Sequence, residues 1–171
     1  KGSGPLGELI KRMDDHHKSL SYLKGDVTMT KVDAALGEAN ADTMQGRVHY
    51  VPRKGNGKMY ITVDWKKPEE RMTIIGDDYK IYRPALKQAY VGSRTKFARS
   101  NSNIATLSIL TMTRDELRSS FKVTLLGETA INDGTKTIQL RLSPKIKAEF
   151  ATADLWVDAS GMPRQVKVVM A

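Results

Sequence analysis

The chain has 171 residues, of which 40% are hydrophobic and 27% charged, so the composition predicts a folded chain rather than a disordered one. It contains no cysteine, which excludes disulfides, thiolate metal sites and a lipid anchor attached through sulfur. The formal net charge is +9, with no basic run longer than two residues. This excess fits either a solvated basic surface or a surface for anionic headgroups or acidic partners.

The first predicted element is an amphipathic helix that begins near Pro5, a residue suited to a first helical turn. Gly25 and Asp26 are expected to end the region that contains this helix. No stretch approaches the roughly 20 apolar residues of a transmembrane helix, and residues 1–5 lack the apolar core of a signal peptide. The protein is therefore expected to be cytoplasmic or to have lost its signal. The apolar side of the helix recurs at steps of three and four residues: Leu6, Leu9, Ile10, Met13, His17 and Leu20.

Beyond this helix the apolar period changes to two, which is typical of strands with one apolar and one polar face. Turn signals rich in Asn, Asp and Gly separate the strands at residues 54–57, 76–78, 132–134 and 158–161. The spacing predicts roughly nine or ten strands in a single curved antiparallel sheet, an unclosed barrel. The alternating apolar positions are Val27, Met29, Met44, Val48, Tyr50, Met59, Ile61, Val63, Trp65, Phe121, Val123, Leu125, Ile138, Leu140 and Leu142.

A helical insertion is predicted between residues 92 and 120, where the alternation disappears. Residues 104–112 are too apolar for a solvated loop, and they follow a polar stretch at residues 97–103. Thr113 and Glu116 have the spacing of a capping box, which begins a short helix that ends near Ser119. No domain boundary is visible, so residues 1–171 are expected to form one domain. The chain ends in strand-like residues, and a final hairpin is expected to be missing.

Catalytic and metal-binding motifs are not found, so neither an enzyme nor a cofactor is predicted. His16 and His17 are adjacent, which on a helix directs them apart, and His49 falls on a polar strand face. Residues 55–58 contain Gly-Asn-Gly-Lys but lack the Ser or Thr that follows the lysine of a phosphate loop. A basic nucleic-acid-binding β module would need exposed aromatic residues such as Tyr82, and aromatic residues make up only 6% of the chain.

Several segments of the chain contain motifs that follow one another in a characteristic order. A strand that contains Trp65 and Pro68 precedes a Gly/Asp hairpin. An aromatic-rich strand then ends in a Pro turn, and a Gln-containing strand follows. The late segment around Trp156 resembles the last hairpin of lipoprotein-sorting proteins. In these segments the chain resembles the LolA/LolB-type periplasmic lipoprotein carriers; they are residues 64–69, 74–77, 79–84, 86–89 and 155–163.

The resemblance implies an unclosed antiparallel barrel with an N-terminal helix and a helical lid over its concave face. It implies a periplasmic, monomeric carrier that moves acylated lipoproteins from a releasing transporter in the inner membrane to an acceptor in the outer membrane. A lipid-binding or envelope-stress sensor of the same fold is the alternative. Arg53 is the nearest match to the arginine that latches the lid in this family. The expected acyl-cavity residues are Met59, Ile61, Val63, Trp65, Ile74, Ile81, Leu86, Leu107, Leu110, Met112, Phe121, Ile138 and Leu140.

Overall fold

The computed structural model describes residues 4–31, 42–67, 69–93, 107, 109–146 and 150–170. Within these residues the chain is mostly β, with two antiparallel sheets, an N-terminal helix and a second short helix. The contacts divide the chain into two compact units, one formed by residues 1–19 and 95–171 and the other by residues 20–94. The expectation of a single domain stays a prediction.

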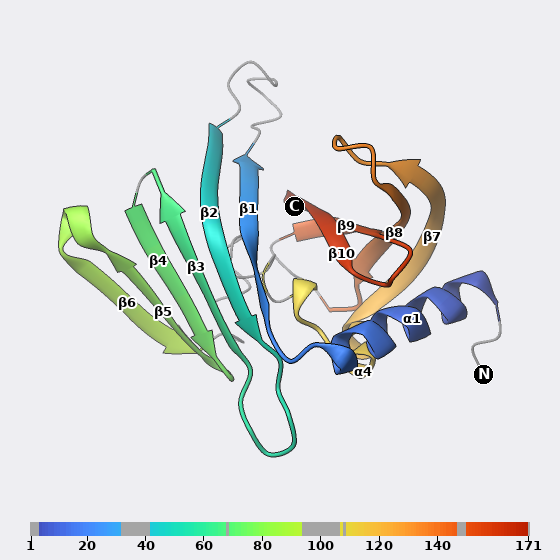
Figure 1. Cartoon of the computed structure of the whole chain (residues 1–171), viewed down its shortest axis with the longest axis horizontal. Helices are drawn as coiled ribbons and strands as arrows, with labels where there is room; N and C mark the ends of the chain where they lie inside the picture. The colour runs from blue at the N-terminus through green and yellow to red at the C-terminus, as the bar shows by residue number, and fades with distance from the viewer. Residues whose placement is uncertain are drawn as a thin grey trace. The chain divides into compact units, whose positions relative to one another are not determined.

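The unit of residues 20–94 is a six-stranded sheet in which every strand pairs with its neighbours in the sequence (Figure 1). This order needs only hairpin connections, which the Gly-rich and Asp-rich turns supply. Beyond the strands, the described residues of this unit form one short 3-10 helix. The elements are β1 (Leu23–Lys31), β2 (Asp42–Val51), β3 (Tyr60–Lys66), β4 (Glu69–Ile75), β5 (Asp78–Arg83), η2 (Pro84–Leu86) and β6 (Gln88–Ser93).

The other unit is a four-stranded sheet with helices on one face. Its elements are α1 (Pro5–Ser19), α4 (Arg114–Ser120), β7 (Phe121–Ala130), β8 (Lys136–Pro144), β9 (Phe150–Val157) and β10 (Pro163–Met170), and the strand order is β10-β9-β8-β7. Leu9 of α1 and Leu117 of α4 join Leu140, Leu142 and Leu155 of the sheet in one buried cluster. The two helices therefore cover the apolar face of this sheet.

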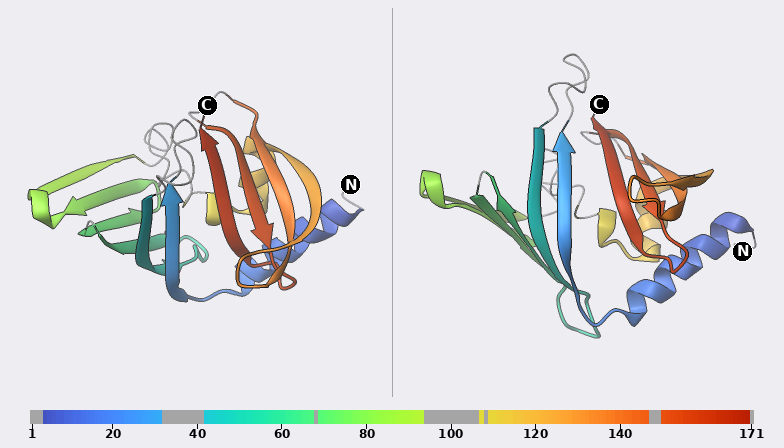
Figure 2. Two further views of the ribbon diagram at one scale, coloured as in Figure 1. Left: turned by 90° about the horizontal axis from the view of Figure 1, so that it is seen from above. Right: turned by 45° about the horizontal axis from the view of Figure 1, so that its top comes forward.

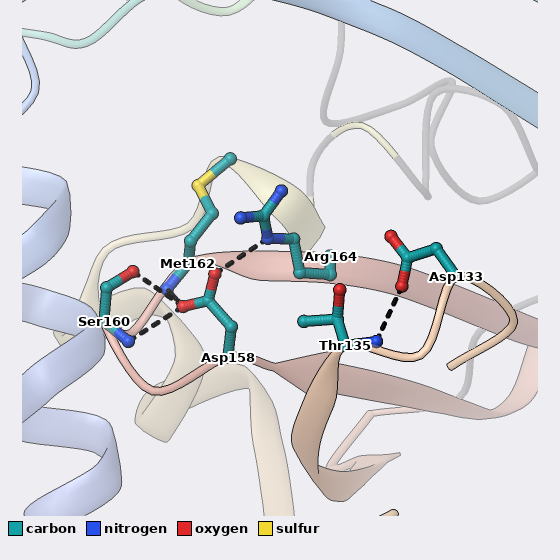
Figure 3. A network of polar contacts seen from close by, with 6 residues as sticks. All are labelled: Asp133, Thr135, Asp158, Ser160, Met162 and Arg164. Carbon is teal, nitrogen blue, oxygen red and sulfur yellow. Dashed lines mark hydrogen bonds and ion pairs between the residues drawn. The ribbon is translucent and has the colours of Figure 1, made fainter. Parts of the chain in front are cut away.

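The β9–β10 hairpin contacts α1 through its turn, and Figures 1 and 2 both show the two side by side. Gly161 has a positive φ of 92°, and a Cβ at this position would lie 2.5 Å from the carbonyl oxygen of Arg12. Asp158 closes the same turn by accepting hydrogen bonds from the backbone N–H and the hydroxyl of Ser160, the N–H of Met162 and Nε of Arg164 (Figure 3). The close contact of Gly161 with the backbone of α1 and the hydrogen bonds to the Asp158 carboxylate thus position this hairpin.

The predicted elements that fall on described residues are found, with three differences. The strands form two sheets instead of one, because β6 and β7 belong to different sheets. Gly25 and Asp26 do not end the first region but lie inside β1, which begins at Leu23. Leu125, predicted on the apolar face, is 37% exposed beside a bulge between Leu125 and Gly127 that shifts the strand register.

The capping box is confirmed: the hydroxyl of Thr113 accepts a hydrogen bond from the N–H of Glu116 at 3.3 Å. Of the apolar segment 104–112, residues 104–106 and 108 lie outside the described residues. Leu107, Ile109 and Leu110 are helical, and the N–H of Thr111 donates to the carbonyl of Leu107. Ile109 belongs to the buried cluster of the four-stranded sheet.

Candidate functional site

The six-stranded sheet carries one apolar face, which we call the inner face. It is formed by side chains that stand in register on β2 to β5: Met44, Val48, Tyr50, Ile61, Val63, Trp65, Met72, Ile74, Tyr79 and Ile81. Val63 is fully buried and Ile74, Met72 and Ile81 are exposed by no more than 2%. Because successive side chains of a strand point to opposite faces, the two-residue alternation in the sequence becomes this continuous apolar surface.

Five of the expected cavity residues lie together on the inner face: Ile61, Val63 and Trp65 of β3, Ile74 of β4 and Ile81 of β5. Met59, which precedes β3, is also buried. Leu86 is different, because η2 turns it outward and leaves it 61% exposed. Its apolar character alone suggested burial, whereas the 3-10 turn after Pro84 removes it from the strand pattern.

The remaining expected residues belong to the other unit. Phe121 and Leu140 are part of the buried cluster of the four-stranded sheet, and Leu110, Met112 and Ile138 pack against it partly buried. Leu107 is also buried. The thirteen residues are therefore divided between the two units, seven in the unit of residues 20–94 and six in the other.

Two polar groups lie on the inner face. Glu70 is 8% exposed, and its carboxylate accepts a hydrogen bond of 2.7 Å from Nε of Arg83. The hydrogen bond from Arg83 raises the pKa of that guanidinium. The indole Nε1 of Trp65 is buried without an acceptor among the residues that the structure describes. Buried donors of this kind are uncommon in folded proteins, so Trp65 is a candidate contact for a polar ligand atom.

The sequence analysis did not identify Glu70 as a residue of the inner face, although its position in the strand indicates this. Glu70 lies two and four residues before Met72 and Ile74, so the strand period places it on the same face. A carboxylate in register with apolar residues indicates a partner, which the structure identifies as Arg83.

The opposite, outer face of this sheet is polar. Arg47 pairs with Asp26 at 3.3 Å and Arg71 pairs with Asp64 at 2.6 Å. The side chains of both pairs are at least half exposed, so each pair contributes little to stability. A shallow groove on this face is lined by Arg71, Thr73, Lys80 and Tyr82.

Arg53, the expected lid latch, is exposed after β2, and its Nε donates to the carbonyl of Gly55 at 3.4 Å within the same turn. Residues 104–106 and 108 of the expected lid are not described, so the latch role stays a prediction. Of the histidines, His17 is partly buried, and this burial lowers its pKa while Asp14 and Glu116 oppose the shift. In the described part of the chain, no group of three or more His, Asp or Glu side chains is arranged to hold a metal ion.

No helix in the described ranges is both long enough and apolar enough to cross a membrane. No protein-family model and no curated protein sequence matches the chain.

The fold is nevertheless found among solved structures. A DUF1329 family protein from Desulfovibrio piger matches with 13% identity and a TM-score of 0.53, over 95% of this chain and 71% of that one. An uncharacterized conserved protein from Thermus thermophilus matches with 13% identity and a TM-score of 0.54, over 98% of this chain and 86% of that one. The CwlD amidase from Clostridioides difficile in complex with the GerS lipoprotein gives a TM-score of 0.35, which does not indicate a common fold. The chain therefore shares its fold with the first two proteins.

Proposed function

We propose that this protein binds acyl chains against the inner face of its six-stranded sheet and serves as a lipoprotein or lipid carrier. The observation that carries the proposal is the continuous apolar surface on β2 to β5, a single sheet layer whose inner side chains are buried. A single sheet does not bury its own apolar face, so other parts of the chain already shield these side chains, and a ligand reaches them by displacing that cover. An acyl chain is a suitable covering group, because each buried CH₂ contributes about 0.8 kcal/mol.

The side chains of the inner face suit a flexible ligand. Met44 and Met72 lie on it, and Met59 is buried just before β3. Methionine is unbranched and polarizable, and it adapts to irregular apolar groups more readily than branched side chains do. The indole N–H of Trp65, which has no acceptor among the described residues, offers a donor to the ester or amide carbonyl at the head of an acyl chain.

A carrier of this type works in the periplasm, where it receives lipoproteins from a transporter of the inner membrane and delivers them to an acceptor of the outer membrane. A lipid-binding sensor is the second candidate function, since it uses the same apolar surface without passing the ligand on. Transfer of a fluorescent acylated lipoprotein from donor to acceptor vesicles separates the two. The carrier accelerates this transfer, whereas a sensor retains the ligand.

The acyl site is tested by the two tryptophans of the chain, one in each unit. In a Trp156→Phe variant Trp65 is the only tryptophan, and in a Trp65→Phe variant only Trp156 remains. Trp65 lies on the inner face, whereas Trp156 alternates with the buried Leu155 and Val157 and points to the polar side of its sheet. A fatty acid brominated along its chain quenches tryptophan at short range. We expect it to quench Trp65 strongly and Trp156 weakly, and equal quenching of both would contradict the proposed site.

A pair of neighbouring substitutions on β2 provides the matched control. Val48 and His49 are both half-buried, and they point to opposite faces of the same strand. Val48→Glu places a carboxylate on the inner face and is expected to weaken fatty-acid binding at least tenfold. His49→Glu places the same group on the outer face and is expected to leave binding unchanged. Absence of fatty-acid binding to the wild-type protein, or equal binding by both variants, would refute the proposal.

The lid is a separate part of the proposal, and it concerns residues 104–112 and Arg53. If this segment opens to admit the ligand, its amides exchange with solvent faster than those of β3 and become slower when fatty acid is added. Exchange as slow as that of β3, and unaffected by ligand, would show that the segment is a fixed part of the core.

A further inference from the structure

In the described part of the chain, strand β6 is an edge strand whose own residues carry none of the usual protection against pairing with other chains. Among the residues that the structure describes, it pairs only with β5, and it is the last strand of its sheet (Figure 1). Edge strands are commonly protected by lysine, proline or a bulge. Gln88–Ser93 contains no charged residue and no proline, and its pairing with β5 is regular.

Apolar side chains are exposed on both sides of this edge. Val91 is 73% exposed and points to the outer face, whereas the neighbouring Tyr90 is 43% exposed and points to the inner face. Tyr82, beside β6 on β5, is 45% exposed. A flat membrane contacts one side of a sheet edge and does not satisfy its free backbone groups. An added strand contacts both sides and pairs with those groups, so the arrangement favours a polypeptide ligand.

The charge near β6 differs between its two ends. At the Ser93 end, the carboxylate of Asp77 accepts a hydrogen bond from the Ser93 hydroxyl and Asp78 pairs with Ser93, whereas the rest of the strand has only basic neighbours along the sequence. Between Asp78 and Asp115 the chain contains seven basic and no acidic residues. Arg83 is neutralised by Glu70. Within the described ranges neither Lys80 nor Lys87 forms an ion pair, and Lys80 stands next to Val91 in the pairing of β5 with β6. From Gln88 to Val91 the edge therefore presents lysines that have no ion pair within the described residues, beside exposed apolar side chains.

We propose that β6 is a docking strand for an extended acidic segment of a partner protein, which adds to the six-stranded sheet as a seventh strand. Backbone hydrogen bonds to β6 provide the pairing. Apolar side chains of the segment contact Val91 and Tyr90, and its carboxylates approach Lys80 and Lys87. A second copy of this chain is a poorer occupant, because pairing of two β6 strands would bring the same lysines together. The inference does not depend on the binding of lipid.

The test uses the full chain and a short fluorescein-labelled peptide that alternates Val and Glu. Fluorescence anisotropy is measured with this peptide, with a Val/Lys peptide, and with a Val/Glu peptide methylated on alternate backbone nitrogens. Val91→Glu adds a repelling carboxylate at the edge. Val169→Glu is the matched control, because Val169 is also an exposed valine on an edge strand, β10 of the other sheet. Thermal unfolding verifies that both variants remain folded.

We expect the Val/Glu peptide to bind and the two other peptides to bind at least about tenfold more weakly. Val91→Glu is expected to weaken binding by a similar factor, and Val169→Glu to leave it unchanged. Equal binding of the methylated peptide would show that charge alone is recognised and would overturn the proposal. A dimer dissociated by Val91→Glu, or binding of anionic vesicles that this substitution abolishes while no peptide binds, would identify a different occupant and also overturn it.

Discussion

Replacement of Asp158 by Asn tests how the β9–β10 hairpin is held. Burial tends to raise the pKa of this carboxyl, but hydrogen bonds from Ser160, Arg164 and Met162 outweigh that effect and lower the pKa from 3.8 to about 2. One pKa unit corresponds to about 1.4 kcal/mol, so the ionised carboxylate stabilises the folded state by about 2 kcal/mol relative to the protonated form. Its side chain is only 10% exposed, which limits solvent screening.

The sign of the pH dependence follows from the lowered pKa. At pH values well above 3.8 the carboxylate is ionised in both the folded and the unfolded chain, and its full contribution is present. As the pH falls toward 2 the unfolded chain takes up a proton first, so the contribution is lost. We expect Asp158→Asn to lower the free energy of unfolding by about 2 kcal/mol at neutral pH, with a difference from the wild type that shrinks below pH 4.

The assay is urea unfolding at several pH values, followed by the fluorescence of Trp156 in a Trp65→Phe background. Trp156 lies two residues before Asp158, so it reports on the unit that contains the hairpin. Asp133→Asn is the control, because the pKa of exposed Asp133 is also lowered, by hydrogen bonds from Thr135, although Asp133 forms fewer contacts (Figure 3). A difference between wild type and Asp158→Asn that stays constant from pH 7 to pH 2 would refute this reasoning.

The other predictions concern packing and are measured by chemical denaturation. Gly161→Ala is expected to destabilise the protein by about 2 kcal/mol or more, because the new Cβ meets the backbone of Arg12; Gly134→Ala, at a similar positive φ of 85° but in open space, should cost less. Equal losses of stability in the two variants would show that backbone strain alone, and not the contact with Arg12, determines the cost. Leu142→Ala removes a fully buried side chain and should cost about 2–5 kcal/mol, whereas a loss below 1 kcal/mol would contradict its place in the core. Thr113→Ala removes the helix cap and should cost about 1 kcal/mol, and no loss would show that the cap is not used.

The sequence by itself determined the local elements. The steps of three and four residues that predicted the first helix placed Leu9 and Ile10 on its buried side. The two-residue alternation placed Ile61, Val63 and Trp65 on one face of β3, and the capping box located the start of α4. These features depend on residues close in the chain, whose side-chain directions follow from the period of the helix or strand.

The tertiary structure decided which strands pair and which apolar residues are buried. The two-residue alternation is the same for a strand in either sheet. It therefore does not predict that β6 and β7 belong to different sheets, or that Gln88–Ser93 forms the edge of one of them. Leu86 is as apolar as Leu140, yet one is 61% exposed and the other fully buried. Glu70 is stable on an apolar face only because pairing of β4 with β5 brings Arg83 to it. Such pairings join distant parts of the chain, and no local pattern encodes them.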